Sequence, residues 1–271
     1  MSEENPPTLS ADTAPASPDP WRNLRRFTSA RIALGRSGGS LPTRALLNFR
    51  LAHARACDAV LAPFDAVALA GRLECLGSPV VLLESAAEDR TEYLQRPDLG
   101  RKLSIPSRRK LEEMAAQMPP CDLVIIVSDG LSTQAVNTQC EPLLAALVPL
   151  LWTDGWILAP LVVVRQARVA LQDEVGAACH ARLSLMLLGE RPGLGSADSL
   201  GAYFTFAPAP GKTDADRNCV SNIRPDGLAP AAAAAKLHRL LGEARRLGVS
   251  GVALKDESKQ IQANQPRLRL E

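Results

Sequence analysis

The stretch LVIIVSDGLST (residues 123–133) decides the fold of this chain. Its first five residues form a nearly continuous apolar, largely β-branched run, which is typical of a strand covered on both faces. A short polar turn follows, and a helical pattern begins at Ser132. A strand that passes through such a turn into a helix is the repeating unit of a parallel α/β sheet.

The same alternation continues on both sides of this stretch. Apolar runs at residues 80–83, 157–164 and 183–188 predict further strands. Helical patterns cover residues 108–118, 132–151, 169–178 and 229–247. Strands that alternate with helices at this spacing predict an α/β fold, with a Rossmann-like, mostly parallel sheet flanked by helices. We expect this sheet-bearing domain, which would face a ligand, to cover residues 111–255.

The segments outside that range have a different character. Residues 21–110 predict a helical N-terminal region, in which one helix starts at Trp21, Gly35 is a stop, and a second helix begins near Pro42. Residues 1–20 contain five prolines among small and acidic residues, which predicts a disordered tail. Residues 256–271 are rich in Lys, Gln, Asn and Arg and predict a flexible C-terminal tail.

The composition excludes several classes of protein. A net charge of +2 argues against a general nucleic-acid binder, and 4% aromatic residues argue against a base-stacking surface. Locally, however, the N-terminal region is rich in arginine, with eight of these residues between Arg22 and Arg55. This cluster is either a solvated helical face or a docking surface for an acidic partner or a phosphate.

Metal, disulfide and membrane sites find no support in the sequence. The six cysteines contain no C-x-x-C pair and the three histidines form no ligand cluster, so we predict no metal site and a reducing, cytoplasmic location. The N-terminus lacks the pattern of a secretory signal. The apolar stretch of residues 142–164 is interrupted by prolines and by Asp154-Gly155, so we interpret it as a buried helix, a turn and a core strand.

Ligands of parallel α/β sheets lie beyond the carboxyl ends of the strands. This rule selects three loops: SDGLS (128–132), RQARV (165–169) and GERPGLG (189–195). The third loop is neither a P-loop nor the dinucleotide fingerprint, because its glycines have the wrong spacing. Ser128 and Ser132 lack a nucleophile elbow and are better explained as turn or N-cap residues. We therefore predict a ligand-binding domain without catalytic residues of its own.

Four motifs together add a specific resemblance. RPDLGR (96–101), VSDGLST (127–133), GERPGLG (189–195) and DRNCVSNI (216–223) occur in this order. From about residue 21 to residue 254, the chain resembles the small (light) subunit of ethanolamine ammonia-lyase. The resemblance implies an adenosylcobalamin-dependent carbon–nitrogen lyase that converts ethanolamine to acetaldehyde and ammonia by radical chemistry.

The same resemblance implies a partner and a division of labour. In that family a large TIM-barrel subunit holds the substrate and the radical-handling residues, and the small subunit completes the cobalamin site within a hetero-oligomer. Activity is therefore expected only with the large subunit. The family also implies a location in the cytoplasm, within a bacterial microcompartment, with neither nucleic acid nor membrane as partner.

Three cobalamin-binding residues carry over from the family: Val169, Glu190 and Cys219. Corrin is a flat apolar ring rimmed with amides, so a valine can pack on it and a glutamate can accept from its amide groups. For Cys219 a buried, inert cysteine that packs closely is expected, although the neighbouring Arg217 would favour a thiolate. The chain lacks D-x-H-x-x-G, so cobalt is expected to keep its own dimethylbenzimidazole ligand.

The residues alone leave two other classes open. A stand-alone nucleotide-binding, Rossmann-like module is supported by fold analogy only. A scaffold subunit would explain the missing catalytic residues, but it would not explain three ligand-facing loops on one edge.

Overall fold

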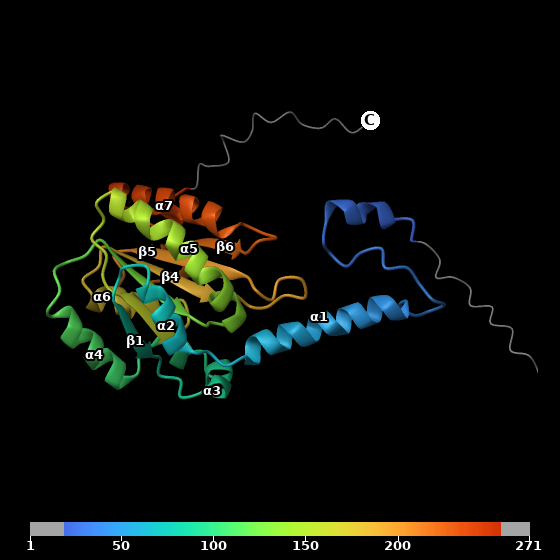
Figure 1. Ribbon diagram of the computed structural model, residues 1–271, viewed down its shortest axis with the longest axis horizontal. Coiled ribbons are helices and arrows are strands. Elements are labelled where there is room, and N and C mark those ends of the chain that lie inside the picture. Colours follow the sequence, from blue (N-terminus) through green and yellow to red (C-terminus); the bar gives the residue numbers. More distant parts are fainter. Residues whose placement is uncertain (1–18, 256–271) are drawn as a thin grey trace, which may run out of the picture. The chain divides into compact units, whose positions relative to one another are not determined.

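The computed structural model describes residues 19–255 (Figure 1). The described chain divides into two units that meet between Arg55 and Ala56. Residues 1–18 and 256–271 of the two predicted tails lie outside the described residues. No helix of the described part is long and apolar enough to cross a membrane.

The smaller unit is less helical than its sequence predicts. A 3-10 helix, η1 (Arg22–Phe27), is followed by irregular chain, and α1 (Thr43–Leu61) begins beside Pro42 and continues past the boundary between the units. Ala33, Gly35 and Gly38 have positive φ angles, which a helix does not allow. The predicted helix from Trp21 is therefore wrong beyond Phe27, whereas the second helix is confirmed.

The larger unit is built on one six-stranded sheet. Its strands are β1 (Val80–Glu84), β2 (Leu123–Ser128), β3 (Leu161–Arg165), β4 (Leu183–Gly189), β5 (Leu200–Phe206) and β6 (Arg217–Ile223). They lie in the order β1-β3-β2-β4-β5-β6. The first four strands are parallel, and β5 runs antiparallel between β4 and β6. The predicted mixed α/β fold with a mostly parallel sheet is confirmed.

Two features of this sheet differ from the expectation. The sequence predicts neither β5 nor β6, which together close the sheet with an antiparallel pair. The sheet also begins earlier than residue 111, because β1 pairs in parallel with β3. As a consequence β1 lies at an edge, whereas the first strand of a dinucleotide-binding fold lies in the middle of the sheet.

Helices cover both faces of the sheet. They are α2 (Ala66–Glu74), α3 (Arg90–Gln95), α4 (Ile105–Ala115), α5 (Thr133–Thr153), α6 (Leu171–Ala178) and α7 (Pro230–Leu247), with short 3-10 turns η2 (Leu99–Arg101), η3 (Asp214–Asp216) and η4 (Gly251–Ala253). α2, α5 and α7 pack on one face, where α5 and α7 lie side by side (Figure 1). α4 and α6 pack on the opposite face.

The run at residues 123–127 explains this layering. Leu123, Ile125 and Val127 belong to the core under α5, while Val124 and Ile126 belong to the core under α4 and α6. All six residues of β2 are buried. Because successive side chains of a strand point to opposite faces, a run without polar positions requires cover on both sides, as predicted.

The helix boundaries follow local capping and tertiary packing. The Ser132 hydroxyl accepts from the Ala135 amide and caps α5, which confirms it as an N-cap residue. The predicted buried helix, turn and core strand of residues 142–164 are confirmed: α5 contains Pro142 and Pro149 and ends at Thr153, a turn follows at Asp154-Gly155, and β3 begins at Leu161. Ten residues of α5 are buried, and this packing outweighs the local cost of the two prolines.

Two helical glycines provide a test of this packing. A Cβ at Gly176 in α6 would lie 2.7 Å from the Pro208 Cβ, whereas one at Gly242 in α7 would meet nothing within 4 Å. Gly176→Ala should therefore lower the free energy of unfolding by about 1–3 kcal/mol. Gly242→Ala, the matched control, should raise it by about 0.5–1 kcal/mol. Urea denaturation of the full chain measures both, and equal effects would contradict the close contact of α6 with Pro208.

Candidate functional site

The crevice between β2 and β4 is the expected ligand position, because the chain leaves these two strands in opposite directions. In this protein it is closed by backbone. The Leu131 amide donates to the Gly189 carbonyl at 2.9 Å. A Cβ at Gly189 would collide with the carbonyl groups of Asp129 and Ser132. The glycines therefore let two loops meet here, and a ligand must lie elsewhere.

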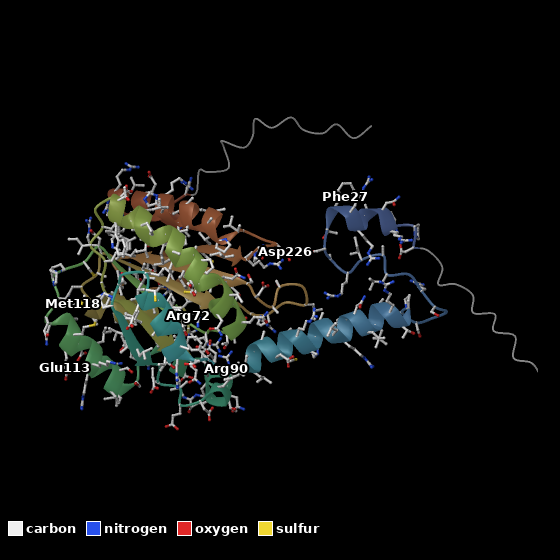
Figure 2. The ribbon with its side chains drawn as sticks, viewed as in Figure 1. Phe27, Arg72, Arg90, Glu113, Met118 and Asp226 are labelled. Carbon is white, nitrogen blue, oxygen red and sulfur yellow. The ribbon has the colours of Figure 1, made fainter. Side chains whose placement is uncertain are left out.

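A buried carboxylate fixes the loops around this crevice. Asp129, 2% exposed, accepts from the Gln166 amide at 2.7 Å and the Ser128 hydroxyl at 3.1 Å through Oδ1. Its Oδ2 accepts from Arg90 Nη1 at 2.8 Å (Arg90 is labelled in Figure 2). Burial raises the pKa of Asp129, while Arg90 and the amide oppose this rise. The side chain thereby ties the β3–α6 loop and α3 to the end of β2.

Val169 lies in the loop that this carboxylate holds. The Ala167 amide donates to Ser128 Oγ at 3.0 Å, and the Arg168 amide donates to the Gly100 carbonyl at 2.7 Å. The Tyr93 hydroxyl donates to the Ala167 carbonyl at 3.2 Å. Val169 itself is partly buried against the core under α6. Two of the four motifs thus hold the loop that presents Val169.

Glu190 joins β4 to the end of β6. Its Oε2 accepts from the Ser199 hydroxyl at 2.5 Å and from the Asn222 amide at 3.2 Å. Asn222 has a φ of 57°, and the pairing of β5 with β6 shifts register nearby. Within residues 19–255 Oε1 accepts no hydrogen bond and Glu190 forms no ion pair with Arg191. Oε2 thus carries both hydrogen bonds that tie Glu190 to Ser199 and to the end of β6, while Oε1 lies against Gly201 of β5.

Cys219 is exposed in the middle of the edge strand β6, so the prediction of a buried cysteine at this position is wrong. It pairs with Tyr203 of β5, and the phenol and the thiol share a hydrogen bond. Desolvation by the surrounding protein atoms raises the pKa of the thiol to about 11, and the Glu190 charge adds to this effect. Cys219 is therefore a neutral thiol near pH 7.

The thiolate hypothesis for Cys219 is wrong, because Arg217 is engaged elsewhere. Its Nη2 forms a buried ion pair with Asp173 of α6, and its Nη1 lies 3.2 Å from Asp214. Burial raises the pKa of Asp173, and Arg217 opposes this rise. The pair connects α6 with the start of β6 and leaves no cation for the cysteine.

The three residues taken from the resemblance lie on the same side of the sheet. Tyr203 is half-buried and packs, like Val169, against the core under α4 and α6. Cys219 is opposite Tyr203, and the negative charge of Glu190 raises the pKa of both side chains. On the other side of β6, Val220 is buried in the core under α7. The α6 side of β5 and β6 thus forms an open face with Val169 and Glu190 beside it.

Sequence reasoning missed several residues that build this face. Tyr203 lies in a strand that was not predicted, although residues 200–206 (LGAYFTF) are rich in apolar and aromatic residues. Arg90 and Asp173 act through partners 39 and 44 positions away along the chain. No local pattern marks such pairs.

Comparisons with known proteins agree with this architecture. The family model described as ethanolamine ammonia-lyase light chain matches residues 18–255. The chain is 54% identical over 239 residues to an ethanolamine ammonia-lyase small subunit of Ralstonia nicotianae, with 88% of each chain covered. It is 53% identical over 249 residues to that of Azotobacter vinelandii, with 92% of each covered. It is 49% identical over 270 residues to an ethanolamine ammonia-lyase small subunit of Pseudomonas paraeruginosa, with 98% of this chain and 97% of the relative covered.

These matches confirm the resemblance drawn from the four motifs, because they span the same part of the chain at about half identity. The chain therefore belongs to the ethanolamine ammonia-lyase light-chain family and is a small subunit of that lyase.

Proposed function

We propose that this small subunit completes an adenosylcobalamin site together with the large subunit of the lyase. The observation that carries this proposal is that Cys219 pairs with Tyr203 on one side of β5 and β6 beside the charge of Glu190, and that Val169 packs on the core of the same side. The assembled enzyme converts ethanolamine to acetaldehyde and ammonia. When bound, the cofactor supplies the radical chemistry, and the protein supplies position and enclosure.

The residues on this face suit a corrin ring. Val169 and the half-buried ring of Tyr203 offer apolar surface for the flat part of such a ligand. Glu190 Oε1 is a free acceptor for an amide N–H at the rim, and it is held in place by the two bonds to Oε2. Cys219, as a neutral thiol, packs as a small apolar group rather than acting as a nucleophile.

We assign no catalytic residue and no metal ligand to this chain. Its proposed contribution is to orient the ring, to hold one rim amide and to exclude water from one side. The substrate and the radical-handling residues then belong to the large TIM-barrel subunit. A stand-alone nucleotide-binding module is less well supported, since the crevice where a dinucleotide would lie is closed by Gly130 and Gly189.

The N-terminal arginines suit a docking role toward the large subunit. Arg22, Arg25 and Arg26 lie on η1, which buries none of its residues. Trp21 and Phe27, at its two ends, are 67% and 68% exposed. A surface that combines exposed aromatic groups with arginine is typical of a protein interface, and its charge suits an acidic patch. We place the assembled hetero-oligomer in the cytoplasm, within a bacterial microcompartment.

The purified chain should be inactive alone. With adenosylcobalamin and ethanolamine it should release no acetaldehyde, and equimolar large subunit should restore activity. The reason is that the proposed chemistry depends on groups of the other subunit. A coupled acetaldehyde assay measures this, with the large subunit alone as control. Turnover by the isolated small subunit would contradict the proposal.

Glu190→Gln in the assembled complex should weaken cobalamin binding by about 1.5–3 kcal/mol, because a charged acceptor becomes neutral. The cobalamin KM and the melting temperature are measured together. Ser199→Ala is the control, since it removes the support of Oε2 but keeps the carboxylate, and it should lower the melting temperature with a smaller effect on KM. Unchanged cobalamin affinity with a lowered melting point for Glu190→Gln would mean that the residue is structural only.

Reversing the charge at Arg25 and Arg26 should slow assembly and weaken it by about tenfold, because steering charges mainly affect association. Surface plasmon resonance against the large subunit measures the rate, and Arg109→Glu on the exposed side of α4 is the control. An unchanged rate, or tight salt-sensitive DNA binding by the free chain, would be incompatible with this docking role.

A further inference from the structure

A groove of about 430 Å³ lies beside Val169. It is formed by the end of the RPDLGR motif, the start of α6 and the segment that leads into β6. Four cationic side chains line it: Arg101, Arg168, Lys212 and Arg217. Asp214 is the one carboxylate among the lining residues, and it extends fully into solvent. Because Asp173 and Asp214 pair with Arg217, the excess positive charge of the groove comes from Arg101, Arg168 and Lys212.

The RPDLGR motif is held at this groove by a close backbone contact. The Gly100 carbonyl accepts from the Arg168 amide at 2.7 Å. A Cβ at Gly100 would lie 2.9 Å from the Arg168 Cγ and 3.0 Å from the Gln166 carbonyl oxygen. Only glycine allows η2 to come this close to the β3–α6 loop. The contact places Arg101, the next residue, at the mouth of the groove.

The cations of the groove are incompletely neutralised within the described chain. Arg101 makes no ion pair in residues 19–255, and Lys212 lies 4.0 Å from its partner Asp216. Arg168 stacks on the Tyr93 ring at 4.2 Å, and its buried Nε has no hydrogen-bond partner among the described residues. The Nε of Arg217, whose side chain is 4% exposed, is buried in the same way without a partner there. Arg101, which is exposed, and Lys212 are therefore the least neutralised cations of the groove, and an external anion is the group that suits them.

We infer that this groove binds the phosphodiester of the cobalamin nucleotide loop, an inference that rests on the proposed function. The corrin rim carries neutral amides, whereas the nucleotide loop carries one phosphate with a negative charge. Arginine and lysine are the side chains that suit such a group. Val169 lines the groove and also belongs to the proposed corrin-facing set, so one ligand can reach both places. Arg101 and Lys212 are then specificity residues for a complete cobalamin.

Comparison of two corrinoids tests this assignment in the assembled complex. Cyanocobalamin contains the nucleotide loop, and dicyanocobinamide lacks it. Arg101→Gln and Lys212→Gln should each raise the Kd of cyanocobalamin about tenfold, as expected for loss of a charge-assisted hydrogen bond. Neither should change the Kd of dicyanocobinamide. Arg101→Lys should recover part of the loss, and Arg109→Gln, with the same charge change outside the groove, should change neither constant. Absorbance titration measures both ligands.

The alternative sources of an anion give different results. If Arg101→Gln and Lys212→Gln lost the same affinity for both corrinoids, or lost affinity for neither, the inference would be overturned. The proposed function would remain intact. Loss of large-subunit binding in Arg101→Gln would show that a carboxylate of the partner fills the groove, which also overturns it. Inorganic phosphate should compete with cyanocobalamin but not with dicyanocobinamide, and phosphate binding without competition would assign the groove to the free ion. A wild-type complex that binds neither corrinoid would instead remove the proposed function itself.

Discussion

The buried carboxylate of Asp129 is the interaction on which the rest of the larger unit depends. It lies at the end of the central strand β2 and accepts hydrogen bonds from a backbone amide of the β3–α6 loop, from Ser128 and from Arg90. Arg90 also donates to the Val60 carbonyl at 2.7 Å and to the Gly130 carbonyl at 2.6 Å. A buried charge is tolerated only when it is paired and hydrogen-bonded. The end of β2, the β3–α6 loop and α3 must therefore adopt their positions together.

The central layers of the fold are predictable from sequence, because they depend on burial. The apolar run of β2 requires cover on both faces, and the patterns of α5 and α7 supply it. The antiparallel pair β5 and β6 is not predictable in the same way. β6 is an edge strand with three exposed positions, so its pattern resembles that of a loop. Its position comes from pairing with β5 and from contacts with η4, such as Asn218 with Gly251.

The candidate site, like the fold, is only partly predictable from sequence. Loop positions at the carboxyl ends of β2, β3 and β4 follow from topology, but the open face lies to one side of that edge. The crevice between β2 and β4 is closed because two glycines, Gly130 and Gly189, let the loops that follow these strands pack against each other. The candidate site therefore lies beside the crevice. Spacing shows where glycines occur, but not which backbone they approach. Val169, Glu190 and Cys219 were accordingly named through the family resemblance, and the structure explains what holds each of them.

The irregular end of β6 has a consequence for the small subunit before it meets its partner. An edge strand exposes unpaired backbone groups that invite pairing with another copy, which leads to aggregation. Here the register shifts near Asn222, whose backbone is left-handed, and the charged Arg217 points inward at the other end. Bulges and inward charges are devices that natural sheets use against edge-to-edge pairing. The same bend that brings Asn222 to Glu190 thus makes the end of β6 a poor template for pairing with another copy of the chain.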